Sequence, residues 1–501
     1  MSKTHPTRFV SLLAISLFML ACGLPFATKN EQPPATATQP SPTEIQQKTP
    51  TSAPAVPTEA PPLPAEKPVE RTTLSENGPW LLIPAIEGLW VANDDGSALR
   101  QITTTPVMSP THLQKGIAPG GYFAFVTAES YETLENLSLM LLKLPEGRLE
   151  TITPLIPSGV KMPQTPEICE PGFEAMRALT IGDSLEWSPD GKTLAYIAFT
   201  PGGTADLYTY SMETGKITQL SDGSSQAFEP SWSPDGTYIL HYGASCFGTG
   251  AGFAMTGAWA SAADGSDTKK LYTFTMQETE YEHVVGWYPP ATALMASASG
   301  CQTSRLRTKD ILSGKETTIY SGCAANAAIA PDGVIGVLVS DFMGEQPGFY
   351  LFTPQGQRIA YIPDDDGVEL EYSDGLGLFL TRHFREGDPP YYETLSFDTK
   401  GAAGAYQSKE ALDFPVLSKD GSRQIEITQK GIKLTGFGSG LGQIEKQGVS
   451  QALLYETGQE PGVLFFVNDT GEFYRASPPD YEPELLSAGI TIWDGATWML
   501  P

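Results

Sequence analysis

The stretch Trp187-Ser-Pro-Asp-Gly191 recurs letter for letter at Trp232-Ser-Pro-Asp-Gly236, and the two glycines are 45 residues apart. In each copy an apolar segment precedes the turn and a second one follows it. Proline presets φ for a turn and glycine accepts a positive φ, so Pro-Asp-Gly reverses the chain at little cost. Each copy therefore predicts two strands joined by a tight turn, and we expect its Trp to pack between neighbouring sheets.

Weaker copies of this turn recur along the rest of the chain, at residues 118–121, 287–290, 330–333, 372–375, 418–421 and 460–462. Further apolar segments that suit third and fourth strands accompany them, as in residues 207–220. A period of about 40–50 residues with four short strands is typical of propeller blades. We therefore expect an all-β fold, a single β-propeller of four-stranded antiparallel blades, about eight in number within a range of seven to nine.

The two ends of the repeated region complement each other. Residues 79–103 resemble a blade without its first strand, and residues 490–498 are expected to supply that strand from the carboxyl end. Closure of this kind joins the ends of the domain and leaves no free sheet edge.

Composition agrees with a turn-rich β protein. The 501 residues include 50 Gly and 42 Pro, too many for a helical bundle, while 40% hydrophobic residues suffice for a large core. The formal charge is −27, from 58 acidic and 31 basic residues. Because nucleic-acid binding requires cations that displace phosphate counterions, no nucleic-acid partner is expected.

The repeats resemble those of the TolB family, whose Trp-Ser-Pro-Asp-Gly unit is matched at residues 187–191 and 232–236. The resemblance covers residues 79–501 and implies an antiparallel β-propeller. The additional α/β domain of that family has no counterpart between the tether described below and residue 79. Similar repeats also occur beside peptidase domains of the prolyl oligopeptidase type, so the resemblance implies a fold rather than an activity.

The amino terminus is typical of a secretory signal. Lys3 and Arg8 precede the 13 apolar residues 9–21, a stretch shorter than the roughly 20 residues that span a bilayer. The sequence Met19-Leu-Ala-Cys22 resembles the bacterial lipobox, which implies that residues 1–21 are removed and that Cys22 carries the acyl chains, palmitate among them. An ordinary secretory signal with an unrelated Cys is the alternative. We expect a lipid anchor in the bacterial cell membrane, with the protein on the extracytoplasmic side, at the cell surface or in the periplasm.

Residues 22–78 are expected to form a tether. They contain Pro, Thr, Ala and Glu with few large apolar residues, so they cannot bury enough surface to offset chain entropy. The expected organisation is therefore a signal peptide, a lipidated and disordered tether, and a propeller over residues 79–501.

Four cysteines other than Cys22 suit disulfides in a secreted chain. In a propeller blade, the loop between the second and third strands lies on the same face as the connection to the next blade. We therefore predict Cys301–Cys323 within one blade and Cys169–Cys246 between the long connection 154–178 and a neighbouring loop. Four alkylatable cysteines in the native protein would contradict both pairs.

Two unusual loops are expected on this face. One is Gly-rich and carries Phe247 and Phe253, and the other, residues 382–392, carries Arg382, His383 and Arg385. Such loops often make the contacts of a propeller, and we propose these residues as ligand-binding candidates; ordinary surface turns are the alternative. The acidic run 364–371 lacks the acid spacing of an EF-hand loop, so we expect a solvated turn rather than a Ca²⁺ site.

We find no complete catalytic motif in the sequence. Gly182-Asp-Ser-Leu185 matches the GDSL esterase motif, but no Asp stands three residues before any His, and the motif runs directly into a repeat. The chain has no Gly-x-Ser-x-Gly or His-Glu-x-x-His motif. We therefore predict no catalytic residue, no metal and no cofactor, and a structural role for His112, His241 and His283.

These observations favour a membrane-anchored lipoprotein whose propeller is a non-catalytic binding or scaffold module for an envelope protein, peptide or glycan. The alternative is an extracellular propeller enzyme, a polysaccharide lyase or hydrolase, whose site comes from several blades and leaves no linear motif. A purely structural envelope protein without a specific ligand is a third reading.

Overall fold

The computed structural model describes most of the chain from residue 72 onward. The described residues are 72–108, 113–130, 136–156, 178, 180–199, 204–222, 225–245, 255–273, 281–298, 303–324, 326–339, 346–364, 366–373, 376–385, 391–411, 415–418, 422–438, 442–456, 460–492 and 495–499. Within these ranges no helix has the length and apolarity needed to cross a bilayer.

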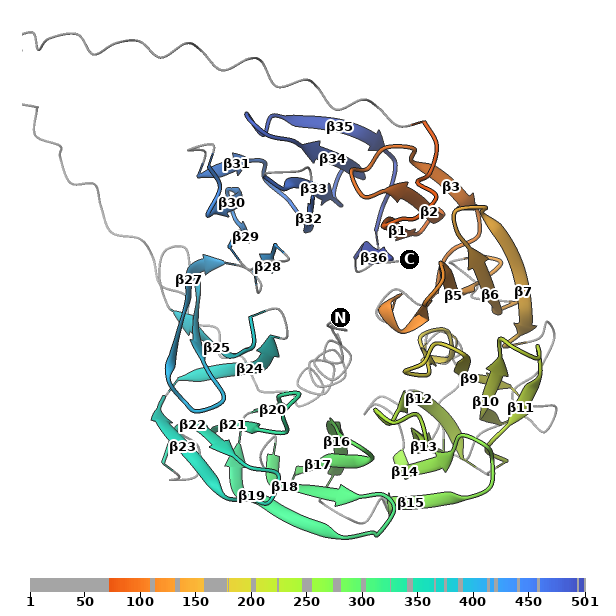
Figure 1. Ribbon diagram of the computed structural model, residues 1–501, viewed down its shortest axis with the longest axis vertical. Coiled ribbons are helices and arrows are strands. Elements are labelled where there is room, and N and C mark those ends of the chain that lie inside the picture. Colours follow the sequence, from red (N-terminus) through yellow and green to blue (C-terminus); the bar gives the residue numbers. More distant parts are fainter. Residues whose placement is uncertain are drawn as a thin grey trace, which may run out of the picture.

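The described strands form nine four-stranded antiparallel sheets arranged as blades around a ring (Figure 1). From the innermost strand outward, the first three blades are β36 (Thr497–Met499), β1 (Trp80–Ala85), β2 (Gly88–Asn93) and β3 (Arg100–Thr103); β4 (Ile117–Ala118), β5 (Tyr122–Thr127), β6 (Ser138–Lys143) and β7 (Arg148–Pro154); and β8 (Leu185–Trp187), β9 (Thr193–Phe199), β10 (Ala205–Ser211) and β11 (Ile217–Gln219). A short 3-10 helix, η1 (Leu113–Gly116), precedes β4.

The other six blades follow in chain order with the same arrangement. They are β12 (Gln226–Trp232), β13 (Tyr238–Ala244), β14 (Met255–Ala262) and β15 (Thr268–Thr273); β16 (Tyr281–Tyr288), β17 (Thr292–Ala298), β18 (Thr303–Asp310) and β19 (Glu316–Ala324); β20 (Asn326–Ile329), β21 (Ile335–Val339), β22 (Gly348–Phe352) and β23 (Arg358–Pro363); β24 (Gly367–Ser373), β25 (Leu378–Arg385), β26 (Tyr391–Phe397) and β27 (Ala403–Ala411); β28 (Val416–Leu417), β29 (Gln424–Thr428), β30 (Gly431–Thr435) and β31 (Gln443–Glu445); and β32 (Gln451–Tyr455), β33 (Gly462–Val467), β34 (Glu472–Ala476) and β35 (Pro483–Ala488).

The expected all-β propeller of four-stranded antiparallel blades is confirmed. The nine described blades lie at the upper end of the expected range and exceed the favoured number of eight by one. Eight blades contain their own turn between the first and second strands. The ninth combines the two ends of the domain and has no such turn, so a count of turns does not include it.

Closure of the ring follows the expected exchange of a strand. β36 pairs antiparallel with β1, where Leu81 lies opposite Trp498, and Ala85 forms a bridge with Ile492. The side chain of Gln451 in the last blade donates to the carbonyl oxygen of Ala496 at 2.8 Å and accepts from its N–H at 2.6 Å. The carboxyl end is therefore held by both the first and the last blades.

The two strong repeats form the predicted turns. Asp190 Oδ1 accepts hydrogen bonds from the Ser188 hydroxyl at 2.6 Å and from the Lys192 N–H at 3.1 Å. Asp235 makes the corresponding contacts in the next repeat. Gly191 and Gly236 have φ values of +70° and +71°, which explains the glycine at the last position.

The tryptophans of the repeats join neighbouring blades, as expected. Nε1 of Trp187 donates to the Gly116 carbonyl at 2.7 Å, and Nε1 of Trp232 donates to the Glu186 carbonyl at 2.9 Å. Trp187 and Trp232 are both buried. Their rings fill the space between sheets, while each indole N–H satisfies a carbonyl of the preceding blade.

Candidate functional site

We call the side of the ring where the first strand of a blade begins the top face. Because the strands of a blade alternate in direction, the second strand ends there and the third begins there. The turn between the first two strands lies on the opposite, bottom face. The candidates Arg382, His383 and Arg385 lie at the top-face end of β25. The prediction that they belong to a loop is therefore wrong: the apolar positions Phe379 and Leu380 continue into these residues as one strand.

His383 is held between two aspartates from the connection that enters β24. Its Nδ1 lies 2.8 Å from Asp366 Oδ1, and its Nε2 lies 3.4 Å from Asp364 Oδ2 and 3.1 Å from the Thr381 hydroxyl. The side chains of His383 and Asp364 are only 2% and 4% exposed, whereas Asp366 is 48% exposed. The expectation of a fully solvated acidic turn is thus wrong for Asp364, which His383 and the neighbouring backbone enclose.

The two aspartates differ in electrostatic environment. Burial raises the pKa of Asp364, although the nearby His383 opposes this shift. Burial would also raise the pKa of Asp366, but hydrogen bonds from His383 and Arg385 outweigh it and hold that pKa below its usual range. At neutral pH, Asp366 is therefore a stable anion between two potential cations.

Arg385 completes this side of the blade. It contacts Asp366, and its Nε donates to Glu393 Oε2 at 2.9 Å from β26. His383 and Glu393 are cross-strand partners, and Arg385 lies two residues further along on the same side of β25. Strand alternation thus gathers these groups on one side of the sheet.

Arg382 points to the other side of the same sheet. Its Nη1 donates to Glu369 Oε2 at 2.7 Å, and its guanidinium carbon lies 4.2 Å from the centre of the Tyr392 ring. The side chain is 8% exposed, so this cation packs within the blade. All three cationic candidates therefore contact carboxylates of their own blade.

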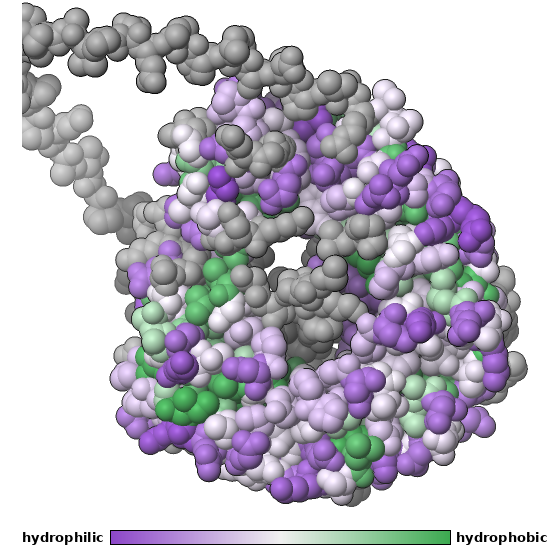
Figure 2. All heavy atoms as spheres, viewed as in Figure 1, coloured by the Kyte–Doolittle hydropathy of each residue, from purple (hydrophilic) through white to green (hydrophobic). Residues whose placement is uncertain are grey.

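The exposed groups at this end of the blade are apolar. Phe384 is 47% exposed and packs edge-on against Tyr392, and Val368 is 46% exposed. Val368 is the extra residue of a β-bulge between Gly367 and Glu369. On the face seen in Figure 2, hydrophilic side chains predominate and apolar surface occurs in small separate patches. Exposed apolar side chains next to ordered ion pairs are typical of a small surface that contacts a binding partner.

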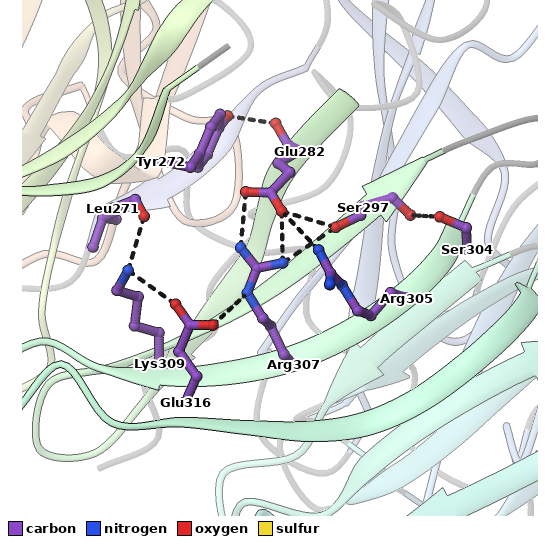
Figure 3. Close-up of polar contacts among 9 residues, drawn as sticks. All are labelled: Leu271, Tyr272, Glu282, Ser297, Ser304, Arg305, Arg307, Lys309 and Glu316. Atoms are coloured by element: carbon purple, nitrogen blue, oxygen red, sulfur yellow. Dashed lines mark hydrogen bonds and ion pairs between the residues drawn. The ribbon is translucent and has the colours of Figure 1, made fainter. Parts of the chain in front are cut away.

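A second charged group, not anticipated from the sequence, lies in the blade β16–β19 (Figure 3). Glu282 accepts from Arg307 Nη1 at 2.6 Å and Nη2 at 2.8 Å, and from the Ser297 hydroxyl at 3.0 Å. Arg307 also pairs with Glu316 at 3.3 Å. The alternation Arg305-Leu-Arg307 was the available sequence signal, since both arginines face one side of the strand. Glu282 and Arg307 at its centre are largely buried and paired with each other, which indicates a structural role.

Glu229 in the inner strand β12 is another residue that the sequence did not reveal. It has a φ of +50° inside a β-bulge, and its N–H donates to the Ser184 hydroxyl at 3.0 Å. A non-glycine residue in this region costs about 1 kcal/mol or more. Burial raises the pKa of its carboxyl, and the charge of Lys115 partly opposes that shift. Among the described carboxyls, Glu229 therefore has properties that acid–base chemistry requires.

Several candidates lie outside the described residues: Cys22, Cys169, Cys246, Phe247, Phe253, Cys301 and His112. Cys323 lies in β19, one residue before its end, and the neighbouring Ala324 pairs with Thr303. Thr303 is the first described residue after Cys301, and both disulfides remain predictions. His241 and His283 lie in the strands β13 and β16.

Comparisons with known proteins support the repeat and the fold. No family model matches the chain. An uncharacterized peptidase of Bacillus subtilis, YuxL, is 48% identical over 54 residues, covering 11% of this chain and 8% of the relative. The Tol-Pal system protein TolB of Alcanivorax borkumensis is 36% identical over 53 residues, covering 11% and 12%. The chain is therefore a β-propeller whose repeats are similar to those of TolB over these segments.

Solved structures share the propeller fold. A crystal structure of a eukaryotic initiation factor aligns with a TM-score of 0.51 and 13% identity, covering 85% of this chain and 99% of that one. TolB from Acinetobacter baumannii aligns over 56% of this chain and 62% of its own, with 14% identity and a TM-score of 0.29. The chain spans about a tenth of the length of the two curated relatives, so those matches show a shared repeat.

Proposed function

We propose that this protein is a lipid-anchored, extracytoplasmic binding module whose propeller presents its top face to an envelope protein, peptide or glycan. Cys22 would carry the anchor, and residues 22–78 would hold the propeller away from the bilayer. The protein carries a formal charge of −27, so acyl chains rather than electrostatic attraction would keep it at an anionic membrane.

One observation carries this proposal. At the top-face end of the blade β24–β27, the cations Arg382 and Arg385 are both paired with carboxylates, while Phe384 and Val368 remain about half exposed. Side chains fixed by ion pairs lose little entropy when a partner binds. Exposed aromatic groups on such a rigid base are typical anchors of binding surfaces.

The test is cross-linking in intact cells, followed by binding measurements with the partner that is identified. The variant Phe384→Ala should lower affinity for that partner by about 10-fold or more, as expected for the loss of an aromatic anchor. Leu312→Ala is the matched control, because Leu312 is 61% exposed but lies in the β18–β19 turn on the bottom face. Equal binding by both variants would contradict a contact at the top face.

The enzyme alternative has its own test. Purified propeller is incubated with envelope polymers, and product formation is compared between the wild-type protein and Glu229→Gln. Under the proposal neither protein turns over any polymer. Turnover by the wild-type protein that ends with Glu229→Gln would replace the binding module with an enzyme.

A further inference from the structure

At the top-face end of the blade β24–β27, one buried carboxylate oxygen lies beside a histidine but has no hydrogen-bond partner among the described residues. One potential ligand atom from each of Asp364, Asp366 and His383 lies within 4.8 Å of the others. These residues come from the β23–β24 connection and from β25, so the group joins the connection from the preceding blade to the second strand of this blade.

The ring orientation of His383 is fixed on one side. Asp366 Oδ1 lies 2.8 Å from Nδ1, and Asp366 is itself held by Arg385. A carboxylate is only an acceptor, so Nδ1 carries a proton and donates it to Asp366. In this tautomer of the neutral ring, Nε2 presents its lone pair to the other side.

On that other side the lone pair faces a second acceptor. Asp364 Oδ2 lies 3.4 Å from Nε2 and has no hydrogen-bond partner among the residues that the structure describes. The side chain of Asp364 is 4% exposed. Its other oxygen, Oδ1, accepts from the Gly367 N–H at 3.1 Å, which fixes the direction of Oδ2 toward the ring. A buried carboxylate oxygen without a hydrogen-bond donor, facing a ring nitrogen, is satisfied either by a shared proton or by a metal ion between the two atoms.

The spacing of these two acceptors suits a metal ion. Two ligands about 2.0–2.1 Å from a tetrahedral Zn²⁺ lie about 3.3–3.4 Å apart. Gly367 leaves space beside Asp364, since a Cβ at this position would lie 3.2 Å from Oδ2. The Thr381 hydroxyl, 3.1 Å from Nε2, provides a further oxygen near the ring.

We propose that Asp364 Oδ2 and His383 Nε2 form a binding site for a divalent first-row transition ion, with Zn²⁺ as the reference ion. Asp366 is a positioning residue that orients the imidazole, an arrangement common behind metal-bound histidines. Mixed imidazole and carboxylate donors favour Zn²⁺ and its neighbours over Ca²⁺, which takes about six to eight oxygen ligands. The ion would attach the β23–β24 connection to β25, next to the exposed Phe384, whose side chain lies on the opposite side of the strand.

The decisive variant is Asp364→Asn. Its amide oxygen can keep the hydrogen bond from Gly367, while its NH₂ group takes the place of Oδ2 and donates to Nε2. The variant therefore satisfies the lone pair without an ion and should fold normally. Without metal, it should be at least as stable to heat as the wild-type chain.

The experiment measures Zn²⁺ binding to the purified full-length chain by isothermal titration calorimetry, and thermal unfolding with EDTA or with Zn²⁺. The wild-type chain should bind one Zn²⁺ at this site and unfold at a higher temperature when it is bound. Asp364→Asn and His383→Gln should bind at least 10-fold more weakly, and Asp366→Asn about 10–100-fold more weakly. Asp267→Asn, which changes an exposed aspartate in another blade, should behave as the wild-type chain does.

Three results would overturn the site. The first is the absence of Zn²⁺ binding by the wild-type chain, and the second is equal binding by the wild-type chain and Asp364→Asn. The third is an imidazole ring of His383 that remains doubly protonated at neutral pH in nuclear magnetic resonance spectra recorded with Zn²⁺ present. In that case a proton, rather than a metal ion, joins the two aspartates.

Discussion

Several buried side chains of this propeller are charged or polar, and the repeats in the sequence do not reveal them. Glu282 and Arg307 are paired inside one blade, and their side chains are 15% and 8% exposed. His241 is 4% exposed and stacks on Trp259, with ring centres 6.1 Å apart. Each group has a specific energetic consequence, because a buried polar group must be paired or remain neutral.

Replacement of Glu282 by Gln should strongly destabilise the blade β16–β19. The change leaves the buried Arg307 guanidinium without its closest counter-charge, which costs roughly 3–5 kcal/mol of unfolding free energy. Urea unfolding at pH 7 measures the loss. Asp267→Asn, which removes an exposed partner of Lys269, should change stability by less than about 1 kcal/mol.

The same pair also affects acid stability. Burial opposes the charged form of Glu282, but the hydrogen bonds and charge of Arg307 outweigh it and hold its pKa below the usual value. Its stabilising contribution is therefore complete above the unfolded-state pKa and is lost as pH falls through the lower folded-state pKa. If Glu282→Gln retained the full acid sensitivity of the wild-type chain, this assignment would be wrong.

His241 should make the propeller less stable at mildly acidic pH. Burial lowers its pKa from 6.5 to about 4, and Nδ1 has no hydrogen-bond partner within the described part of the chain. The unfolded chain thus takes up a proton at higher pH than the folded one, so stability is lost as pH falls from about 6.5 to about 4. Between pH 7.5 and 5 this residue accounts for about 2 kcal/mol.

The check is urea unfolding of the wild-type chain and His241→Phe at these two pH values. The variant should lose less stability on acidification by about that amount. His283, whose pKa burial also lowers to about 4, should supply a similar dependence in both proteins. An unchanged pH dependence in His241→Phe would assign the effect to other groups.

At the scale of elements, the blade is a sheet whose inner strands are buried on both sides and whose outer strand is amphipathic. β33 is buried along its whole length, whereas the outer strand β35 is largely exposed. Specific side-chain contacts between neighbouring blades set the distance between them. The Trp of the repeated turn supplies such a contact through both its ring and its indole N–H.

Replacement of Trp232 by Phe should weaken the junction between the blades β8–β11 and β12–β15. The change removes the hydrogen bond to the Glu186 carbonyl and leaves unfilled space, together worth about 1–3 kcal/mol. Trp90→Phe is the control, since Nε1 of Trp90 has no hydrogen-bond partner among the described residues. Equilibrium unfolding should show the larger loss for Trp232→Phe; equal losses would exclude a role for the hydrogen bond.

At the scale of the whole molecule, the ring is closed by one short strand. β36 covers the inner edge of β1, and Met499 is fully buried. A core cluster joins Leu81 and Ile83 of the first blade to Leu464 and Phe466 of the last. The stability of the two blades is therefore linked.

A chain that ends at Asp494 should lose this closure. It exposes the backbone edge of β1 and removes buried Met499, which together cost roughly 3–5 kcal/mol. Differential scanning calorimetry should show a lower unfolding temperature, and light scattering should show association through the open edge. A chain ending at Met499 should match the full-length protein; the same stability in both truncations would contradict closure by β36.

The amino-acid sequence was sufficient to predict the propeller, the four-stranded blade and the closure by the carboxyl end. These features follow from a local repeat, in which Pro-Asp-Gly turns and apolar segments recur at a nearly constant spacing. The ninth blade was harder to count because it is assembled from residues 80–103 and 497–499 and contains no turn of its own between its first two strands.

The contacts between polar groups could not be predicted, because they depend on how distant parts of the chain come together in the fold. His383 and Asp364 are separated by a turn and most of two strands, and a bulge at Val368 shifts their register. Glu282 reaches Arg307 only because strands β16 to β18 lie side by side in one sheet. Local patterns specify strands and turns, whereas cross-strand contacts depend on register, bulges and loop paths, which are set by packing of the whole ring.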